Sequence, residues 1–295
     1  MVNNDAAGAG TSSGSPWPSA ARKIAFFVVL LAAYIGAQLS YQWAGRYAPG
    51  GADWAALAAA LVLSAALLAL YAGVVRLLER RAARELAPAP RQGVAGIILG
   101  LALFSSVFGL LRVMGVARWH GASVGFDVLP VLAVSILAAV GEELAFRGGL
   151  FRLLEESFGT TTALVVSAAL FGLLHGLNPG ATVISTASIA LEAGVLLAAA
   201  YALTRNLWLP IGLHLGWNFT EGGIFGVSVS GGAVSKGIFS VALVGHTLLT
   251  GGKFGPEASI AATVVCLAVA VVLLVLAARR GRWLPMPRRA VRSMA

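Results

Sequence analysis

Three charged residues stand in a stretch of sequence that is otherwise apolar: Glu142, Glu143 and Arg147, in AAVGEELAFRGGLF. A charge at the centre of a membrane helix costs roughly 2.5–3.5 kcal/mol on insertion scales, so such residues are expected to be paired or to have a function. Glu143 and Arg147 are four residues apart and can pair on one helix face. Glu142 points about 100° away, with no partner in its own helix. It is therefore a candidate general base, although a cluster solvated at the membrane interface would have no such role.

Two histidines and an asparagine stand in other apolar stretches. His175 lies in ALFGLLHG, and His214 precedes Asn218 by four residues in GLHLGWN, so the last two share a helix face. If a helical hairpin turns near residues 158–159, Glu142 and His175 are each about 16 residues from the turn and lie at one level. Glu142 could then take a proton from a water molecule that His175 helps to hold. His214 and Asn218 could donate hydrogen bonds to an oxyanion.

The same residue types are also zinc ligands. Glu142, His175 and His214 could hold Zn²⁺ with a fourth position open, and their spacing does not decide between a metal site and a metal-free one. The sequence has no HExxH motif, and no serine or cysteine is set beside a base, so a covalent nucleophile is not indicated. Cys266 is the only cysteine, which excludes an intrachain disulfide and a cysteine-based metal cluster.

The elements that must position these residues are predicted from composition and hydropathy. Of the 295 residues, 58% are hydrophobic and 11% are charged, with a mean hydropathy of +0.85, whereas a soluble domain is about one quarter charged. Several apolar stretches are long enough to cross roughly 30 Å of hydrocarbon. We therefore expect an all-α, polytopic membrane protein, with about eight transmembrane helices in one bundle enclosing an intramembrane site. The expected helices are 24–45, 53–76, 93–115, 127–156, 160–176, 181–204, 206–223 and 257–278.

Composition divides the chain into three parts. Residues 1–21, rich in Gly, Ser, Ala and Pro, are expected to be a disordered leader, residues 22–278 the membrane domain, and residues 279–295 a basic cytoplasmic tail. The net charge of +9 does not indicate nucleic acid as a partner, because most of the 21 Lys and Arg residues flank hydrophobic segments. Their asymmetry predicts a multi-pass protein of the cell membrane with both termini in the cytoplasm. The lipid bilayer is then its first partner.

Three motifs resemble those of a known family. EExxxR, FxxxH and HxxxN occur in this order and look like the motifs of the type II CAAX prenyl endopeptidases and their prokaryotic relatives, the CPBP or Abi membrane proteins. The resemblance covers about residues 128–222, and it implies an intramembrane endopeptidase with an eight-helix fold. By position in the motifs, it implies that Glu142 and His175 activate water. The other residues it implies are His214 and Asn218 for the oxyanion hole, and Glu143, Arg147 and Phe171 as support for the site.

The resemblance leaves the metal and the substrate open. The family has been described both as metalloproteases and as metal-independent glutamate proteases. Asn218 favours the metal-independent form, because its amide suits a position that must donate a hydrogen bond and does not suit one that must hold a metal. On that view we expect no cofactor, with a divalent metal such as zinc as the alternative. The substrate is expected to be a peptide or a lipidated or membrane protein, with prenylation left open.

Other functions could use the same residues. A non-catalytic membrane scaffold or bacteriocin-immunity protein could keep the fold without cleaving peptides, and a transporter could use the buried charges as an ion relay. No inverted repeat of broken helices is visible, which counts against the transporter. The first three helices and the tail lie outside the resemblance and add little to it. The Gly-rich segment 224–256 is predicted to be a flexible linker, with a lid over the cavity as the alternative.

Overall fold

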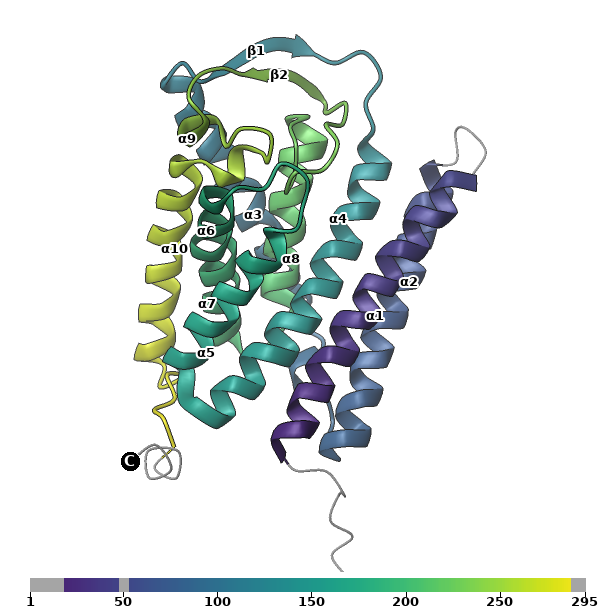
Figure 1. Ribbon diagram of the computed structural model, residues 1–295, viewed down its shortest axis with the longest axis vertical. Helices are drawn as coiled ribbons and strands as arrows, with labels where there is room; N and C mark the ends of the chain where they lie inside the picture. The colour runs from purple at the N-terminus through teal and green to yellow at the C-terminus, as the bar shows by residue number, and fades with distance from the viewer. Residues whose placement is uncertain (1–18, 48–52, 288–295) are drawn as a thin grey trace, which may run out of the picture.

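The computed structural model describes residues 19–47 and 53–287, and in this part of the chain helices form a bundle with two short strands across one end (Figure 1). The α-helices are α1 (Ser19–Tyr47), α2 (Asp53–Val74), α3 (Pro90–Val113), α4 (Val128–Glu143), α5 (Arg152–His175), α6 (Val183–Ile189), α7 (Val195–Thr204), α8 (Trp208–Asn218), α9 (Thr247–Thr250) and α10 (Ile260–Arg279). The π-helical turns η1 (Val75–Glu79), η3 (Leu144–Phe151), η4 (Ala190–Gly194) and η5 (Phe219–Ile224) continue α2, α4, α6 and α8. The 3₁₀ turns η2 (Arg84–Leu86) and η6 (Pro256–Ala258) lie in connecting segments.

Six helical segments of the described chain are long and apolar enough to cross a membrane: Ala20–Gly45, Asp53–Glu79, Pro90–Val113, Val128–His175, Val183–Thr204 and Ile260–Arg279. The fourth segment contains two antiparallel helices, because the backbone at Gly159 (φ 81°, ψ 170°) is not helical (Figure 1). The turn predicted near residues 158–159 is therefore confirmed. α8 with η5 is a further, shorter helix of the bundle and is not among these six segments. The predicted fold class, an all-α polytopic membrane protein, is confirmed.

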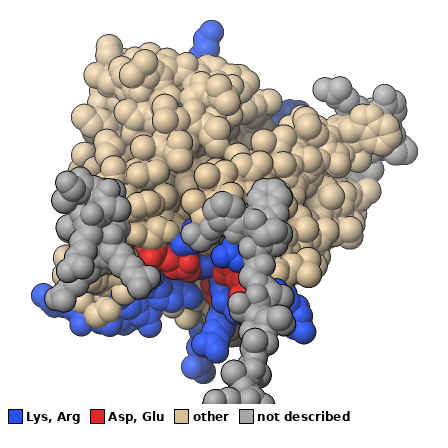
Figure 2. Space-filling model, turned by 60° about the horizontal axis from the view of Figure 1, so that its bottom comes forward, with Lys and Arg blue, Asp and Glu red and all other residues tan. Residues whose placement is uncertain are grey.

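The two ends of the described chain lie on one side of the bundle. α1 begins, and α10 ends, at the lower end in Figure 1, as the predicted topology requires. α1 begins at Ser19, so the last three residues of the predicted leader are helical, while residues 1–18 and 288–295 lie outside the described residues. Figure 2 shows Lys and Arg gathered at this end, with Asp and Glu among them. We term it the basic end; that it faces the cytoplasm stays a prediction.

Part of the predicted basic tail packs on the protein at this end. Thr160 donates from its backbone N–H to the carbonyl oxygen of Leu284 at 2.9 Å, and the N–H of Leu284 donates to Thr160 Oγ1 at 2.8 Å. The neighbouring Gly159 has a positive φ, and a Cβ there would contact the backbone of residues 284–286. The tip of the α4–α5 hairpin therefore needs glycine for both its turn and the contact with the tail.

Two strands that the sequence analysis did not predict cover the other end. β1 (Ala117–Ala122) pairs antiparallel with β2 (Phe239–Leu243), with Ala117 opposite Leu243 and Trp119 opposite Val241. β1 follows α3, and β2 lies between η5 and α9, so the pairing joins segments that are far apart in the sequence. No short-turn signal links them, which is why the hydropathy pattern gave no indication of a strand.

α3 and α8 are in backbone contact through glycines. A Cβ on Gly96 or Gly100 would collide with the backbone of α8. A Cβ on Gly212 or Gly216 would likewise collide with the backbone of α3. In each helix the two glycines are four residues apart, the small-xxx-small pattern that lets membrane helices approach closely. Because α8 carries two of the predicted site residues, this contact sets their position. α3, which lies outside the resemblance, therefore takes part in positioning the site.

The segment between η5 and α10 is packed against the bundle. Gly231 donates from its N–H to the carbonyl oxygen of Phe254 at 2.6 Å, and Phe254 is buried. Asn178, just after α5, donates from Nδ2 to the carbonyl oxygen of Ser230 at 3.0 Å. Residues 224–256 therefore fold back over the end of α5. The prediction of a flexible linker is wrong, and the packing agrees with the alternative, a cover over the site.

Candidate active site

Glu142 lies at the end of α4 and faces α1. The hydroxyl of Tyr34 donates to Glu142 Oε1 at 2.7 Å, and Gln38 Nε2 donates to that hydroxyl at 2.9 Å. The ring of Tyr34 fills the space that a Cβ on Gly141 would need. The second oxygen, Glu142 Oε2, is buried and has no hydrogen-bond partner among the described residues. Sequence reasoning missed Tyr34, although a tyrosine and a glutamine four residues apart in an apolar helix were a visible signal.

His175 and Phe171 lie one turn apart at the end of α5. His175 Nε2 is 3.8 Å from Glu142 Oε2, so the hairpin brings these two side chains together. The carbonyl oxygen of Phe171 lies 2.8 Å from His175 Nδ1 and can only accept, so Nδ1 carries a hydrogen. The rings of Phe171 and His175 have centroids 4.5 Å apart, and the Arg147 guanidinium lies 4.6 Å from the centroid of Phe171. Phe171 thus makes the contacts expected of a supporting residue.

Glu143 and Arg147 form a buried ion pair on one face of the helix. Arg147 Nη1 donates to Glu143 Oε1 at 2.8 Å, and the two side chains are 1% and 0% exposed. Arg147 Nη2 also donates to the carbonyl oxygens of Ala193 and Gly194, at 3.0 and 3.1 Å. These carbonyls belong to η4, and Arg147 itself belongs to η3. The pair is therefore held between two π-helical turns, which are frequent at functional sites.

His214 connects this ion pair to Glu142. Its Nδ1 lies 3.1 Å from Glu143 Oε1, and its Nε2 lies 4.0 Å from Glu142 Oε2. Glu143 Oε1 also accepts from Arg147, so it faces His214 Nδ1 as an acceptor, and Nδ1 carries a hydrogen. Glu142, Glu143 and His214 therefore form one cluster with His175.

Three hydrogen-bond acceptors converge in this cluster. With a hydrogen on Nδ1, a neutral His175 presents the lone pair of Nε2, and the same holds for a neutral His214. Both nitrogens face Glu142 Oε2, which can only accept when it is ionised. Buried acceptors without a donor are costly. The arrangement calls for a donor between them: a water molecule, a proton on one imidazole, or a cation.

A cavity of about 30 Å³, room for one or two water molecules, opens beside these groups. His175, His214 and Asn218 line it, together with Phe171. The side-chain amide of Asn218 makes no hydrogen bond within residues 19–47 and 53–287, so it can bind an atom that enters the cavity. The predicted site residues Glu142, Glu143, Arg147, Phe171, His175, His214 and Asn218 all line this cavity or contact a residue that does.

A second group of acidic residues borders the same cavity, and sequence reasoning missed it. Glu192 of η4 and Glu257 of η6 line the cavity, and Glu221 of η5 contacts Glu257. All three are buried. Glu257 Oε1 accepts from the backbone N–H of Ser230 at 2.7 Å, and burial raises the pKa of the Glu257 carboxyl group above its usual value. The sequence feature that could have indicated this group is one glutamate in each of the stretches ALEAG, FTEGG and GPEAS.

Glu142, His175 and His214 have the atom types of a zinc site but not its spacing. Ligands of a tetrahedral zinc ion, at roughly 2.1 Å from it, are about 3.4 Å apart. Here Glu142 Oε2 lies 3.8 Å from His175 Nε2 and 4.0 Å from His214 Nε2. The described part of the chain holds no group of three or more His, Cys, Asp or Glu that could bind a metal ion. As arranged, these residues do not fit a metal, and metal dependence stays a prediction to be tested.

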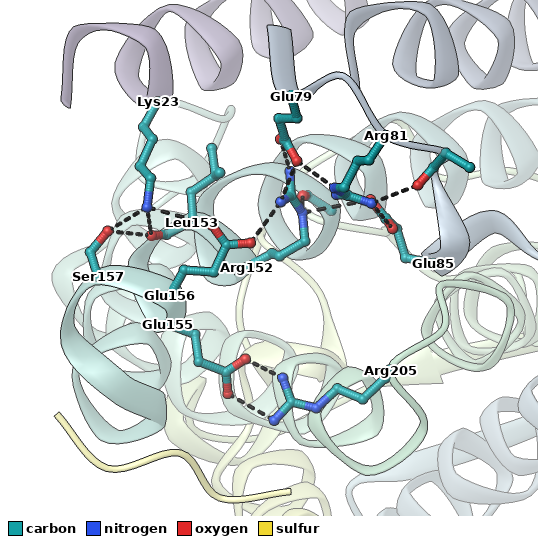
Figure 3. A network of polar contacts seen from close by, with 12 residues as sticks. Lys23, Glu79, Arg81, Glu85, Arg152, Leu153, Glu155, Glu156, Ser157 and Arg205 are labelled. Carbon is teal, nitrogen blue, oxygen red and sulfur yellow. Dashed lines mark hydrogen bonds and ion pairs between the residues drawn. The ribbon is translucent and has the colours of Figure 1, made fainter. Parts of the chain in front are cut away.

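The charged residues at the basic end form a different kind of cluster (Figure 3). We call it the basic-end network; its charged members are Lys23, Glu79, Arg81, Glu85, Arg152, Glu155, Glu156 and Arg205. Arg81 donates to both oxygens of Glu85 at 2.8 Å. Burial opposes the ionisation of Glu85, but hydrogen bonds from Arg81 and Tyr71 outweigh it and hold the pKa of Glu85 below its usual value. None of the buried polar atoms without a partner in the described chain belongs to this network.

The fold and the cluster together define a class: a polytopic helical membrane protein with a buried Glu/His/Asn site. Residues 123–220, about a third of the chain, match the family model described as type II CAAX prenyl endopeptidase Rce1-like. The resemblance predicted from the motifs is therefore confirmed over this segment. The segment includes the seven predicted site residues but not Tyr34, Glu221 or Glu257. No match was found among curated proteins or among solved structures.

Proposed function

We propose that the protein is an intramembrane endopeptidase, CAAX prenyl protease-like, that hydrolyses a peptide bond with water activated by Glu142 and His175. One observation carries the proposal: unpartnered Glu142 Oε2 faces two imidazole nitrogens beside a cavity of water size. The Rce1-like match over the same segment supports the reaction class. The apolar helices support a multi-pass membrane location, for which we propose an orientation with both termini in the cytoplasm.

The first step is the attack of water on the carbonyl carbon of the substrate. A water molecule between Glu142 Oε2 and His175 Nε2 can donate one hydrogen bond to each, which leaves an oxygen lone pair free for attack. As the new carbon–oxygen bond forms, Glu142 takes a proton from this water. Tyr34 holds the other oxygen of Glu142 and so keeps Oε2 directed at the water.

The second requirement is stabilisation of the oxyanion. Asn218 can donate from Nδ2, because its amide is not otherwise engaged in the described structure. His214 can donate from Nε2 only as an imidazolium, since the hydrogen on Nδ1 faces Glu143. We assign His214 this charged form, flanked by Glu142 and Glu143. When the intermediate collapses, the carbon–nitrogen bond breaks and Glu142 returns its proton to the leaving amine.

The scaffold and immunity alternatives leave the central observation unexplained, because neither needs a buried carboxyl oxygen without a hydrogen-bond partner beside a cavity of water size. A transporter could use such a group as an ion relay, but the Rce1-like match favours a peptidase. The proposed substrate is a peptide, or a lipidated or membrane protein, that reaches the site from the bilayer. The proposed reaction needs no cofactor.

The test compares new peptide termini in membranes of the host carrying wild type, Glu142→Gln or Glu156→Gln at equal abundance. Glu156 is a carboxylate of the basic-end network, 47% exposed, and serves as the matched control. We expect products with wild type and Glu156→Gln and none with Glu142→Gln. Products that persist with Glu142→Gln would overturn the assignment. If wild type yields none where the gene has a phenotype, the scaffold alternative replaces the enzyme.

The same assay, on purified protein with a metal chelator, decides the role of a metal. We expect the cleavage rate to be unchanged by the chelator. A loss of cleavage that added Zn²⁺ restores would instead assign Glu142, His175 and His214 as ligands.

A further inference from the structure

Trp217 brings to the cavity a hydrogen-bond donor that the fold leaves unused. Its indole Nε1 is buried and has no hydrogen-bond partner among residues 19–47 and 53–287. Of the side chains in this part of the chain that carry such an unpartnered buried atom, Trp217 is the one that lines the cavity. An indole nitrogen can only donate, and a buried donor without an acceptor is costly. An acceptor that arrives with the substrate removes this cost.

α8 carries Trp217 beside the two residues proposed for the oxyanion. At about 100° per residue, Trp217 stands about 60° from His214 and about 100° from Asn218, so the three lie on one side of the helix. All three line the cavity. A Cβ on Gly100 would meet the backbone nitrogen of Trp217, so the glycine contact between α3 and α8 reaches this point. The same contact therefore positions all three side chains.

The ring of Trp217 is held by an aromatic contact. Phe104 of α3 packs against it with ring centroids 5.1 Å apart and ring planes at 89°. Trp217 is 5% exposed and Phe104 is 0% exposed. A ring enclosed in this way does not turn to find an acceptor elsewhere, so its N–H is satisfied where it lies. The choice is between the face of Phe104, which is a weak acceptor, and an atom that enters the cavity.

The size of the cavity restricts that atom. About 30 Å³ gives room for one or two water molecules, which the attacking water and one further oxygen atom would fill. The oxygen that takes up negative charge during the attack is the carbonyl oxygen of the bond that is cleaved. Asn218 is so far the one neutral donor proposed for this oxygen, because His214 can donate from Nε2 only as an imidazolium. A second neutral donor strengthens the oxyanion hole without adding charge.

We propose that Trp217 is a catalytic residue whose indole N–H donates, together with Asn218, to the carbonyl oxygen of the bond that is cleaved. The assignment rests on the proposed function and adds a donor to its oxyanion hole. As the water oxygen bonds to the carbonyl carbon, the electron pair of the carbonyl π bond moves to this oxygen, and the hydrogen bond from Nε1 becomes stronger. The indole keeps its proton throughout, and the electron pair returns when the carbon–nitrogen bond breaks.

The first test removes the N–H and keeps an aromatic ring. Trp217→Phe is paired with a variant that carries benzothienylalanine at position 217, in which sulfur replaces the indole N–H at nearly the same shape. We expect both to lower kcat about 10²-fold, as the loss of one oxyanion donor does, with KM nearly unchanged. The control makes the same two changes at Trp208, whose Nε1 donates to the carbonyl oxygen of Leu86 at 3.4 Å. There we expect a lower Tm and an unchanged kcat.

The results of this test separate the new assignment from the proposed function. Wild-type kcat in the benzothienylalanine variant would overturn the assignment, whatever the effect on Tm, and would leave the N–H of Trp217 to the face of Phe104. A rise in KM at unchanged kcat would also overturn it, because the N–H would then bind a part of the substrate that does not react. Both results leave the endopeptidase standing, since wild type still cleaves. If wild type cleaves no peptide, the proposed function fails and the assignment fails with it.

The second test detects the hydrogen bond itself. Glu142→Gln protein with ¹⁵N in its tryptophan indoles is titrated with a peptide that wild type cleaves, and with the same peptide in which CH₂ replaces the carbonyl group of the cleaved bond. The signal of Trp217 is identified by its absence in Trp217→Phe. We expect its indole proton to move downfield with the first peptide and not with the second. Equal movement with both peptides, or movement with neither, would overturn the assignment.

Discussion

Two clusters of charged residues in this protein are built in opposite ways. In the basic-end network each charged side chain has an opposite partner, as between Arg205 and Glu155 (Figure 3). Around the cavity, Glu142 Oε2, Glu143 Oε2 and Glu221 Oε2 are buried without hydrogen-bond partners in the described structure. Both clusters use glutamate and arginine on helices of the same bundle, so residue type does not distinguish them. What distinguishes them is whether the protein itself satisfies its polar atoms.

This difference separates charges that serve stability from charges held for a ligand. Leaving one buried polar atom unpaired costs about 1–3 kcal/mol. Several such atoms in one place are explained if water or a substrate forms the hydrogen bonds that the protein does not supply. A network whose polar atoms all have partners within the protein needs no ligand. The comparison therefore assigns chemistry to the cavity and stability to the basic end. Pairs of variants that change the same residue type, one at the cavity and one elsewhere in the bundle, can test that assignment.

The largest effect is expected from a pair of asparagines. Asn218→Ala removes the proposed oxyanion donor, which typically costs about 10²–10³ in rate. Asn206→Ala is the control, because Asn206 bonds only within the fold: it donates to the carbonyl oxygen of Ala87 and accepts from the N–H of Trp208. We expect the first variant to lose kcat at unchanged Tm and the second to lose Tm at unchanged kcat. Equal kcat in Asn218→Ala and wild type would remove Asn218 from the site.

A smaller loss is expected when α3 is pushed away from α8. A Cβ on Gly100 would meet the backbone of Leu213 and Trp217, whereas a Cβ on Gly109 of the same helix meets nothing within 4 Å. Displacing site residues by about 1 Å can cost about 10²-fold in rate. We expect Gly100→Ala to lose activity of about this size, and Gly109→Ala to be neutral or slightly stabilising, since alanine favours a helix. If both variants keep full activity, the glycine contact does not position the site.

Much of the site can be predicted from the sequence because its spacing is local. A spacing of four residues separates Glu143 from Arg147 and His214 from Asn218. The position of His175 along α5, level with Glu142, follows from counting residues from the turn at Gly159. The helices follow from hydropathy, because a chain in lipid must satisfy its backbone within each helix.

What could not be predicted depends on contacts between distant segments. Tyr34 reaches Glu142 across 108 residues, and the cluster of Glu192, Glu221 and Glu257 gathers residues from three separate turns. Contacts between distant segments leave no periodic pattern in the sequence. β1 and β2 were not predicted for the same reason. The glycine pairs of α3 and α8 are a different case, because their spacing was visible in the sequence.

Tyr34 tests whether a helix outside the family match serves the site. Tyr34→Phe removes the hydrogen bond to Glu142 Oε1 and leaves the ring that packs on Gly141. A hydrogen bond to a charged group contributes about 1.5–3 kcal/mol, so we expect kcat to fall about 10-fold or somewhat more, with KM and Tm nearly unchanged. Tyr41→Phe, on the same helix, should leave kcat as it is. A fall in Tm without a fall in kcat would make Tyr34 a packing residue only.

The smallest effect on activity is expected at Glu85 in the basic-end network. The pKa of Glu85 is lowered in the folded protein, so its ionised form stabilises the fold above the ordinary value of 4.5, and this contribution is lost as pH falls below that value. Glu85→Gln should therefore lower the Tm by a few degrees at pH 7, and the difference from wild type should shrink below about pH 4.5. The kcat of the folded variant should equal that of wild type, because Glu85 touches Arg81 and Tyr71 and not the cavity. A variant with unchanged Tm but reduced kcat would show that the basic end acts on the cavity, and the division between stability and chemistry would fail.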